Sequence, residues 1–272
     1  MIPPQPIASS SSSALPDLVP FIQPIVMPNR VELPYNPTNR KHKKIITYAI
    51  KPVKEHAVNA QSILTLSARK VIVQQKFQES ATKHYIYPAF ANDWSLANSS
   101  TLYMILSNPY KLIIHMLKKI VCTNIALFHL CPGAQLMVSE VEFKIYKIAE
   151  LLSKWTFPPK FTFGMDESGI SYFLENEVLW HVVLDAIMEL SLYKYLTDLD
   201  SIFCAAAVAL KCALQEFATG WFIDIEFAGD VYTELYHRLL EHLEAITADP
   251  SLLAQWNEYK DLTHTRLMQL CS

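Results

Sequence analysis

Apolar residues recur at spacings of three and four along most of the chain, which is the period of an α-helix that buries one face. The segments 58–77, 107–133 and 139–155 show this pattern clearly. Ser139 and Glu142 have the spacing of a helix-capping box at the start of the third segment. The pattern predicts an all-α fold, a single globular domain of about seven to eight packed helices.

The C-terminal part predicts four more helices, at 176–193, 200–220, 229–246 and 249–270. Asn176, Asp200 and Asp249 are placed as their N-caps, and Gly220 suits the position just after a helix end. Residues 157–175 break the helical rhythm with prolines, glycines and alternating aromatic residues. They predict a loop with one short hairpin.

The densest run of small apolar residues is AAAVALKCALQEFATG, residues 205–220. Lys211 and Glu216 are five positions apart and point in different directions on a helix, so its polar residues do not converge. Alanines surround the predicted helix nearly all the way round, which is typical of a buried helix. We therefore predict a central packing helix here rather than a reactive site.

The first residues differ from the rest of the chain. Nine of the 16 prolines lie within residues 1–38, together with a run of serines. Proline blocks helix propagation, so this composition predicts an extended, disordered segment. The predicted organisation is a disordered Pro/Ser-rich tail at 1–40 and an all-helical domain at 41–272.

The formal net charge of −3 hides an asymmetry, because residues 1–160 carry about +10 and residues 161–272 about −13. Hydrophobic residues make up 51% of the chain, which is enough for a sizeable core. The asymmetry favours two halves that pack on each other, or on a second copy, with complementary fields. A nucleic-acid or membrane partner is the alternative.

Cysteine usage and the N-terminal composition indicate an intracellular protein. The five cysteines include no C-x-x-C pair, and most lie in apolar helical patterns, which indicates a reducing compartment without disulfides. The N-terminus lacks the features of a signal peptide, and no uninterrupted apolar run is long enough to span a membrane. We expect a nuclear or cytoplasmic protein that is not secreted, has no transmembrane segment and binds no membrane.

A basic cluster, RKHKK, contains Arg40, Lys41, Lys43 and Lys44. Such a cluster is typical of a nuclear-import signal or of a polyanion-binding site. The alternative is a solvated first turn of a helix. No interleaved arginine and aromatic residues follow, which disfavours an RNA-binding platform.

The histidines, acids and cysteines form no recognisable catalytic or metal-binding pattern. His237 and Glu241 are four residues apart, but His242 is rotated away from them, so an exposed ion pair is favoured over a metal site. Cys212 lies among alanines, where burial raises a thiol pKa and makes it unreactive. Phosphate-binding glycine motifs and nucleophile-elbow motifs are absent, and the chain has only five glycines. We expect no metal and no cofactor.

Residues 205–246 resemble the C-terminal core of a domain family from basidiomycete fungi, domain of unknown function 6532. The resemblance rests on the alanine-rich helix, Cys212-Ala213-Leu214, Glu216-Phe217, Thr219-Gly220, Phe227 and the amphipathic helix at 232–243. Upstream, TFPPKFTFG and the segment after it are similar to the family's aromatic loop and following helix, although the His-Pro that often opens this helix is missing near Asn176. The resemblance covers about 45–270, implies a fungal source and an all-helical fold, and supplies no catalytic residues.

The missing catalytic motifs, the predicted tail and the charge asymmetry favour a non-enzymatic protein-interaction module whose partner is a protein. The oligomeric state stays open. One alternative is an enzyme or small-ligand binder with a pocket between helices, using His181 or another scattered histidine. A second alternative is a nucleic-acid-associated protein that uses the basic residues at 40–54.

Overall fold

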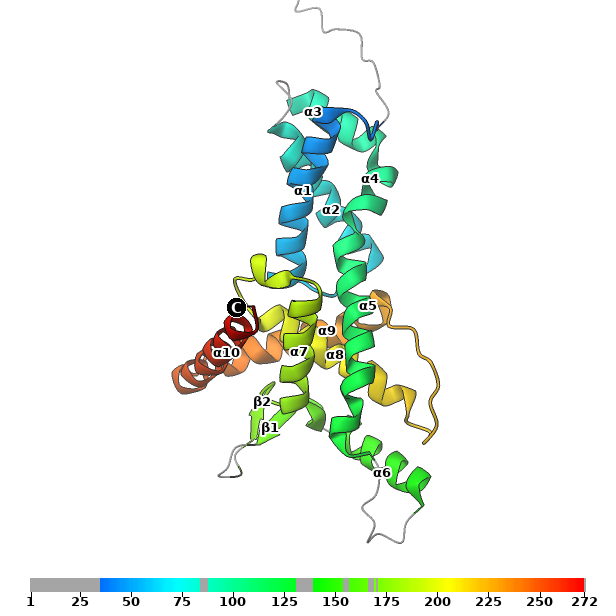
Figure 1. The fold of residues 1–272 in the computed structure, drawn as a ribbon, viewed down its shortest axis with the longest axis vertical. Coiled ribbons are helices and arrows are strands. Elements are labelled where there is room, and N and C mark those ends of the chain that lie inside the picture. The colour runs from blue at the N-terminus through cyan, green and yellow to red at the C-terminus, as the bar shows by residue number, and fades with distance from the viewer. Residues whose placement is uncertain are drawn as a thin grey trace, which may run out of the picture. The chain divides into compact units, whose positions relative to one another are not determined.

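The computed structural model describes residues 35–83, 88–130 (side chains from 92), 139–153, 157–165, 169 and 171–271. The predicted all-α class is confirmed, since helices dominate these residues and one small two-stranded sheet accompanies them (Figure 1). The helices are α1 (Arg40–Asn59), α2 (Leu66–Thr82), α3 (Pro88–Ala97), α4 (Ser99–Leu106), α5 (Asn108–Asn124), α6 (Glu140–Leu152), α7 (Glu177–Glu189), α8 (Asp200–Glu216), α9 (Gly229–Ile246) and α10 (Pro250–Cys271).

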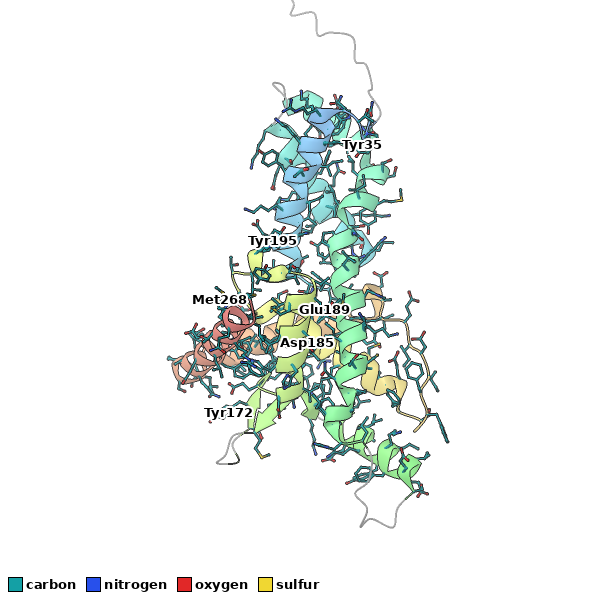
Figure 2. All side chains as sticks on the ribbon, viewed as in Figure 1. Tyr35, Tyr172, Asp185, Glu189, Tyr195 and Met268 are labelled. Atoms are coloured by element: carbon teal, nitrogen blue, oxygen red, sulfur yellow. The ribbon has the colours of Figure 1, made fainter. Side chains whose placement is uncertain are left out.

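The predicted tail lies almost wholly outside the described residues, so the boundary at residue 40 stays a prediction. The described chain begins at Tyr35 (Figure 2). The backbone N–H of Tyr35 donates to Asn98 Oδ1 at 2.7 Å, and its ring lies 6.2 Å from that of His42. Asn39 then caps α1, because its side chain accepts hydrogen bonds from the N–H groups of Lys41 and His42.

α8 is the most deeply buried helix. All residues from Ser201 to Leu210 are buried, and so are Cys212, Ala213 and Leu214. α8 packs against α5, α7 and α9, and α5 also runs beside α7 (Figure 1). Small alanine side chains allow these neighbours to approach closely. The prediction of a buried packing helix is therefore confirmed.

The predicted helix at 58–77 is interrupted between α1 and α2. Within the break, the backbone N–H of Ser62 donates to Ser201 Oγ at 3.1 Å and to Tyr236 Oη at 3.0 Å, in a fully buried position. Thr65 then caps α2. The helical spacing was misleading here because hydrogen bonds from distant helices replace those of a continuous helix.

Two predicted helix starts and the predicted hairpin are confirmed. The Asn176 side chain accepts from the N–H groups that open α7, and Ser139 Oγ accepts from the Glu142 N–H at 3.2 Å at the start of α6. Strands β1 (Phe163–Met165) and β2 (Ser171–Phe173) pair antiparallel.

The prediction that Asp200 caps α8 is wrong, because Leu199 occupies the N-cap position. The Asp200 carboxylate instead accepts hydrogen bonds from Trp256 Nε1 at 2.8 Å and Lys260 Nζ at 3.1 Å. These contacts attach α10 to the start of α8. A tertiary contact has therefore replaced a local cap at this carboxylate.

Asp249 caps α10 as predicted, since its Oδ1 accepts from the Ser251 N–H at 2.8 Å and the Leu252 N–H at 3.4 Å. The hydrogen bonds from Ser251, with that from Leu252, hold the pKa of Asp249 below the ordinary value of 3.8. A lowered folded-state pKa contributes stability above the unfolded-state pKa, and this contribution is lost as the pH falls through the folded-state pKa.

We therefore expect Asp249→Ala to lower the Tm at neutral pH, and the difference from wild type to shrink as the pH falls through the folded-state pKa below 3.8. Thermal unfolding followed by circular dichroism over a series of pH values measures both Tm values. A Tm difference that stays constant while the carboxylate becomes protonated would contradict the capping role.

Candidate functional site

A buried ion pair joins α5 to the end of α8. The side chain of Glu216 is fully buried, and its Oε1 lies 2.9 Å from Lys118 Nζ. Lys118 Nζ also lies 2.7 Å from Asp224 Oδ1 and donates to the backbone carbonyl of Ile225. The Ile225 N–H donates to Glu216 Oε1 at 3.0 Å. These contacts tie the segment after α8 to both helices. The sequence predicted only that Lys211 and Glu216 point in different directions, and it did not reveal these partners of Glu216.

The charges of this cluster stabilise one another. Burial alone would lower the pKa of Lys118, but its hydrogen bonds to the carboxylates of Asp224 and Glu216 outweigh burial and raise that pKa above its ordinary value. The hydrogen bond from Lys118 in turn lowers the pKa of Asp224. Lys118 therefore stays charged and compensates the buried Glu216 carboxylate.

Two thiols lie beside the ion pair. Cys122 Sγ donates to Glu216 Oε2 at 3.6 Å, and Cys212 Sγ donates to the Ile225 carbonyl at 3.7 Å. Burial, with the Glu216 charge, raises the pKa of Cys122 to about 11. Burial also raises the pKa of Cys212, as expected from its alanine-rich surroundings. A raised pKa lowers the fraction of reactive thiolate at neutral pH, both for the buried Cys212 and for Cys122, which is exposed beside the ion pair.

The tied segment carries three consecutive large apolar side chains, Trp221–Ile223, which we call the aromatic segment. They are 69%, 57% and 52% exposed. The Ile223 N–H donates to the Glu216 carbonyl at 2.8 Å. Gly220 has the predicted positive φ, 85°, although α8 has already ended at Glu216. A Cβ on Gly220 would lie 2.6 Å from Val141 Cγ1, so the turn sits directly against α6.

A groove of about 490 Å³ lies beside the ion pair and is called the α5 groove below. Its α5 wall contains Lys111, His115 and Lys118, and its other walls come from the start of α2 and from residues 224–230. Sequence reasoning missed this groove because its walls come from three separate segments. The basic residues on α2 and α5 and the acidic residues at 224–230 are far apart in the sequence.

The predicted basic cluster lies at the start of α1, a different helix from those that form the ion pair and the α5 groove. Arg40, Lys41, Lys43 and Lys44 are all exposed there, and the first turn has no acidic residue. Their positive charges add to the partial positive charge of a helix N-terminus. Nuclear import and polyanion binding through this cluster stay predictions.

The prediction of an exposed ion pair between His237 and Glu241 is wrong. No ion pair joins them, and His237 Nε2 is buried without a hydrogen-bond partner. His242 packs 4.9 Å from the Phe173 ring, and burial lowers its pKa. His181 lies on α7 beside an acidic residue of its own helix. Over the described ranges, no group of three or more His, Cys, Asp or Glu side chains is placed to hold a metal ion.

Residues 69–246 match the model of a protein family described as domain of unknown function 6532 (DUF6532). The chain belongs to this family. The match runs from α2 to the end of α9, so the family's domain contains the buried ion pair, the aromatic segment and most of the α5 groove. No curated protein and no solved structure matches the chain. None of the helices in the described part of the chain is long and apolar enough to cross a membrane.

Proposed function

We propose that this member of domain family 6532 is a non-enzymatic protein-interaction module that binds its partner through the aromatic segment. One observation carries the proposal: Trp221–Ile223 are 69%, 57% and 52% exposed while their backbone is held by Glu216. Exposed apolar side chains in a contiguous run mark interaction surfaces more often than isolated ones do.

The fixed backbone of this segment favours tight binding. Ordering a flexible loop on binding costs conformational entropy, and here Glu216 and Lys118 already hold both ends of the turn. Tryptophan and other aromatic residues contribute most to the binding energy of protein interfaces. Ile145 on α6, 39% exposed, extends the apolar surface, since a Cβ on Gly220 would lie 3.3 Å from its Cγ1.

The charges around the aromatic segment favour a protein partner over a membrane. Asp224 and Glu226 follow the segment directly and are exposed. An exposed carboxylate pair next to the apolar side chains is repelled by anionic lipid surfaces. A protein surface with an apolar hollow and a basic rim fits this arrangement.

Several features support a binding role over catalysis. The thiols of Cys122 and Cys212 have raised pKa values, and Lys118 is held in a buried ion pair. The Ser62, Ser201 and Tyr236 hydroxyls bond to one another in the closed interior rather than facing a groove. These groups stabilise the fold, whereas the three consecutive side chains of the aromatic segment are exposed.

Site-specific crosslinking tests the proposal. A photoreactive amino acid replaces Trp221 in one variant and Met268 in a matched control, because Met268 on α10 is also an exposed apolar side chain (67%; Figure 2). Both variants are irradiated in lysate of cells that express the chain. We expect a discrete protein adduct from position 221 that is missing from position 268.

The adduct is then identified, purified and titrated against the chain. We expect Trp221→Ser to weaken binding about 30-fold, the effect of losing a typical hot-spot residue, and Met268→Ser to leave the Kd unchanged. The Tm of Trp221→Ser should match that of wild type, because the side chain is exposed. No adduct at position 221, a lipid adduct, or an adduct of twice the chain's mass would each overturn the proposal.

A further inference from the structure

Arg69 on α2 is a buried cation without a carboxylate partner. It is 8% exposed, and its Nη2 donates to the Leu64 carbonyl at 3.2 Å. Its Nε has no hydrogen-bond partner, and no carboxylate among the described side chains forms an ion pair with it. Its guanidinium carbon lies 5.8 Å from the centre of the Tyr110 ring. An uncompensated buried charge is costly, so its position in the wall of a groove points to an anionic ligand.

Arg69 lines the α5 groove, and two further side chains that carry nitrogen donors line it with Arg69. Lys111, a cation, and His115, an imidazole that can donate a hydrogen bond, lie one turn apart on α5 and line the same groove. Lys111 has no ion-pair partner among the described residues and is exposed. The groove therefore offers nitrogen donors from two helices.

The third wall adds the positive end of a helix. Gly229 and Asp230, the first residues of α9, line the groove, and Ala228 at the N-cap has no side chain that could accept from their N–H groups. A Cβ on Gly229 would lie 2.4 Å from the Leu64 carbonyl oxygen, so glycine allows α9 to begin this close to α2. Arg69 is the independent sign that this uncapped start faces an anion.

The carboxylates of the groove limit what it can hold. Asp224 is paired with Lys118 at 2.7 Å, and Asp230 Oδ1 accepts from the Leu66 N–H at 2.9 Å. Glu226 also lines the groove. A polyanion such as nucleic acid would meet all three carboxylates, whereas one compact anionic group at the start of α9 lies next to Asp230 alone, whose Oδ1 already accepts from the Leu66 N–H.

We propose that the α5 groove binds an organic monophosphate. The oxygens of a phosphate group point in tetrahedral directions, which suits donors arriving from α2, α5 and α9, whereas the two oxygens of a carboxylate lie in one plane. Leu64, Ile114 and Phe227 line the same groove and provide contacts for the organic part. The volume of about 490 Å³ is that of a small-molecule site.

Calorimetric titration of the full chain with phenyl phosphate tests this site. We expect saturable binding at one site, weakened about tenfold by Lys111→Gln through loss of one charge-assisted hydrogen bond. Arg69→Gln should abolish binding, but Arg69 is buried and this variant's fold needs checking by circular dichroism. The exposed Lys111 keeps the test valid if Arg69→Gln unfolds. Lys119→Gln, an exposed lysine of the same helix outside the groove, is the matched control and should bind like wild type.

Related probes separate phosphate recognition from other causes of binding. Benzyl alcohol should not bind, because it carries no anionic group. Benzoate lacks the tetrahedral phosphate and inorganic phosphate lacks the organic part, so each should bind at least tenfold more weakly than phenyl phosphate. Equal binding of benzoate, equal binding of inorganic phosphate, or no saturable binding of phenyl phosphate overturns the proposal. So does a Kd that Lys111→Gln leaves unchanged. None of these outcomes depends on the aromatic segment.

Discussion

Lys118→Met should lower the free energy of unfolding by about 3–5 kcal/mol, because it leaves a buried charge without its partner. The stranded charge is Glu216, whose side chain is fully buried and whose nearest cation is Lys118 Nζ at 2.9 Å. Urea denaturation followed by circular dichroism measures the change. Lys119→Met is the matched control on the same helix, and it should change stability by less than about 0.5 kcal/mol because Lys119 is exposed.

A double variant separates the buried charge from the loss of lysine packing. Lys118→Met combined with Glu216→Gln removes both charges of the buried pair and should be more stable than Lys118→Met alone, since no unpaired buried carboxylate is left. If Lys118→Met and Lys119→Met unfold at the same urea concentration, the ion pair does not stabilise the fold. If the double variant has no higher free energy of unfolding than Lys118→Met alone, the unpaired Glu216 carboxylate is not the cause of the lost stability.

The same variant links the ion pair to the proposed binding surface. Lys118 holds Asp224 and the Ile225 carbonyl, which follow the aromatic segment directly. Loss of these contacts should speed hydrogen exchange of the backbone amides after Gly220 and weaken partner binding while Trp221 itself is unchanged. Fixed backbone geometry, in addition to exposed apolar area, would then determine affinity.

Local signals in the sequence predicted local structure well. Asn176, Ser139 and Asp249 each bond to N–H groups two or three residues later, so their capping roles depend only on neighbouring residues. The hairpin within 157–175 was likewise predicted from its own prolines, glycines and alternating aromatics. Asp200 differs because contacts from α10 determine its bonds, and those contacts cannot be seen in the surrounding residues.

The candidate sites depend on contacts between distant segments, and this is why the sequence revealed little of them. The ion pair joins Glu216 on α8 to Lys118 on α5. The groove residues Arg69, Lys111 and Gly229 come from three different helices. One signal was present: a glutamate among alanines on a helix that is otherwise buried must find a cation. The burial of α8 was predicted correctly, but the residue that compensates Glu216 could not be identified without the fold.

Ala209→Leu and Ala213→Leu should each lower the free energy of unfolding by about 1–3 kcal/mol, because extra carbon atoms must fit into a well-packed interior. Both alanines are fully buried on α8, which contacts α5, α7 and α9. Leucine has nearly the helix propensity of alanine, so the loss reports packing rather than helix formation. Ala254→Leu on α10 is the matched control, since Ala254 is exposed and should tolerate the same change. Urea denaturation of the three variants decides the point: if all three unfold like wild type, α8 is not closely packed and its alanine-rich sequence has another cause.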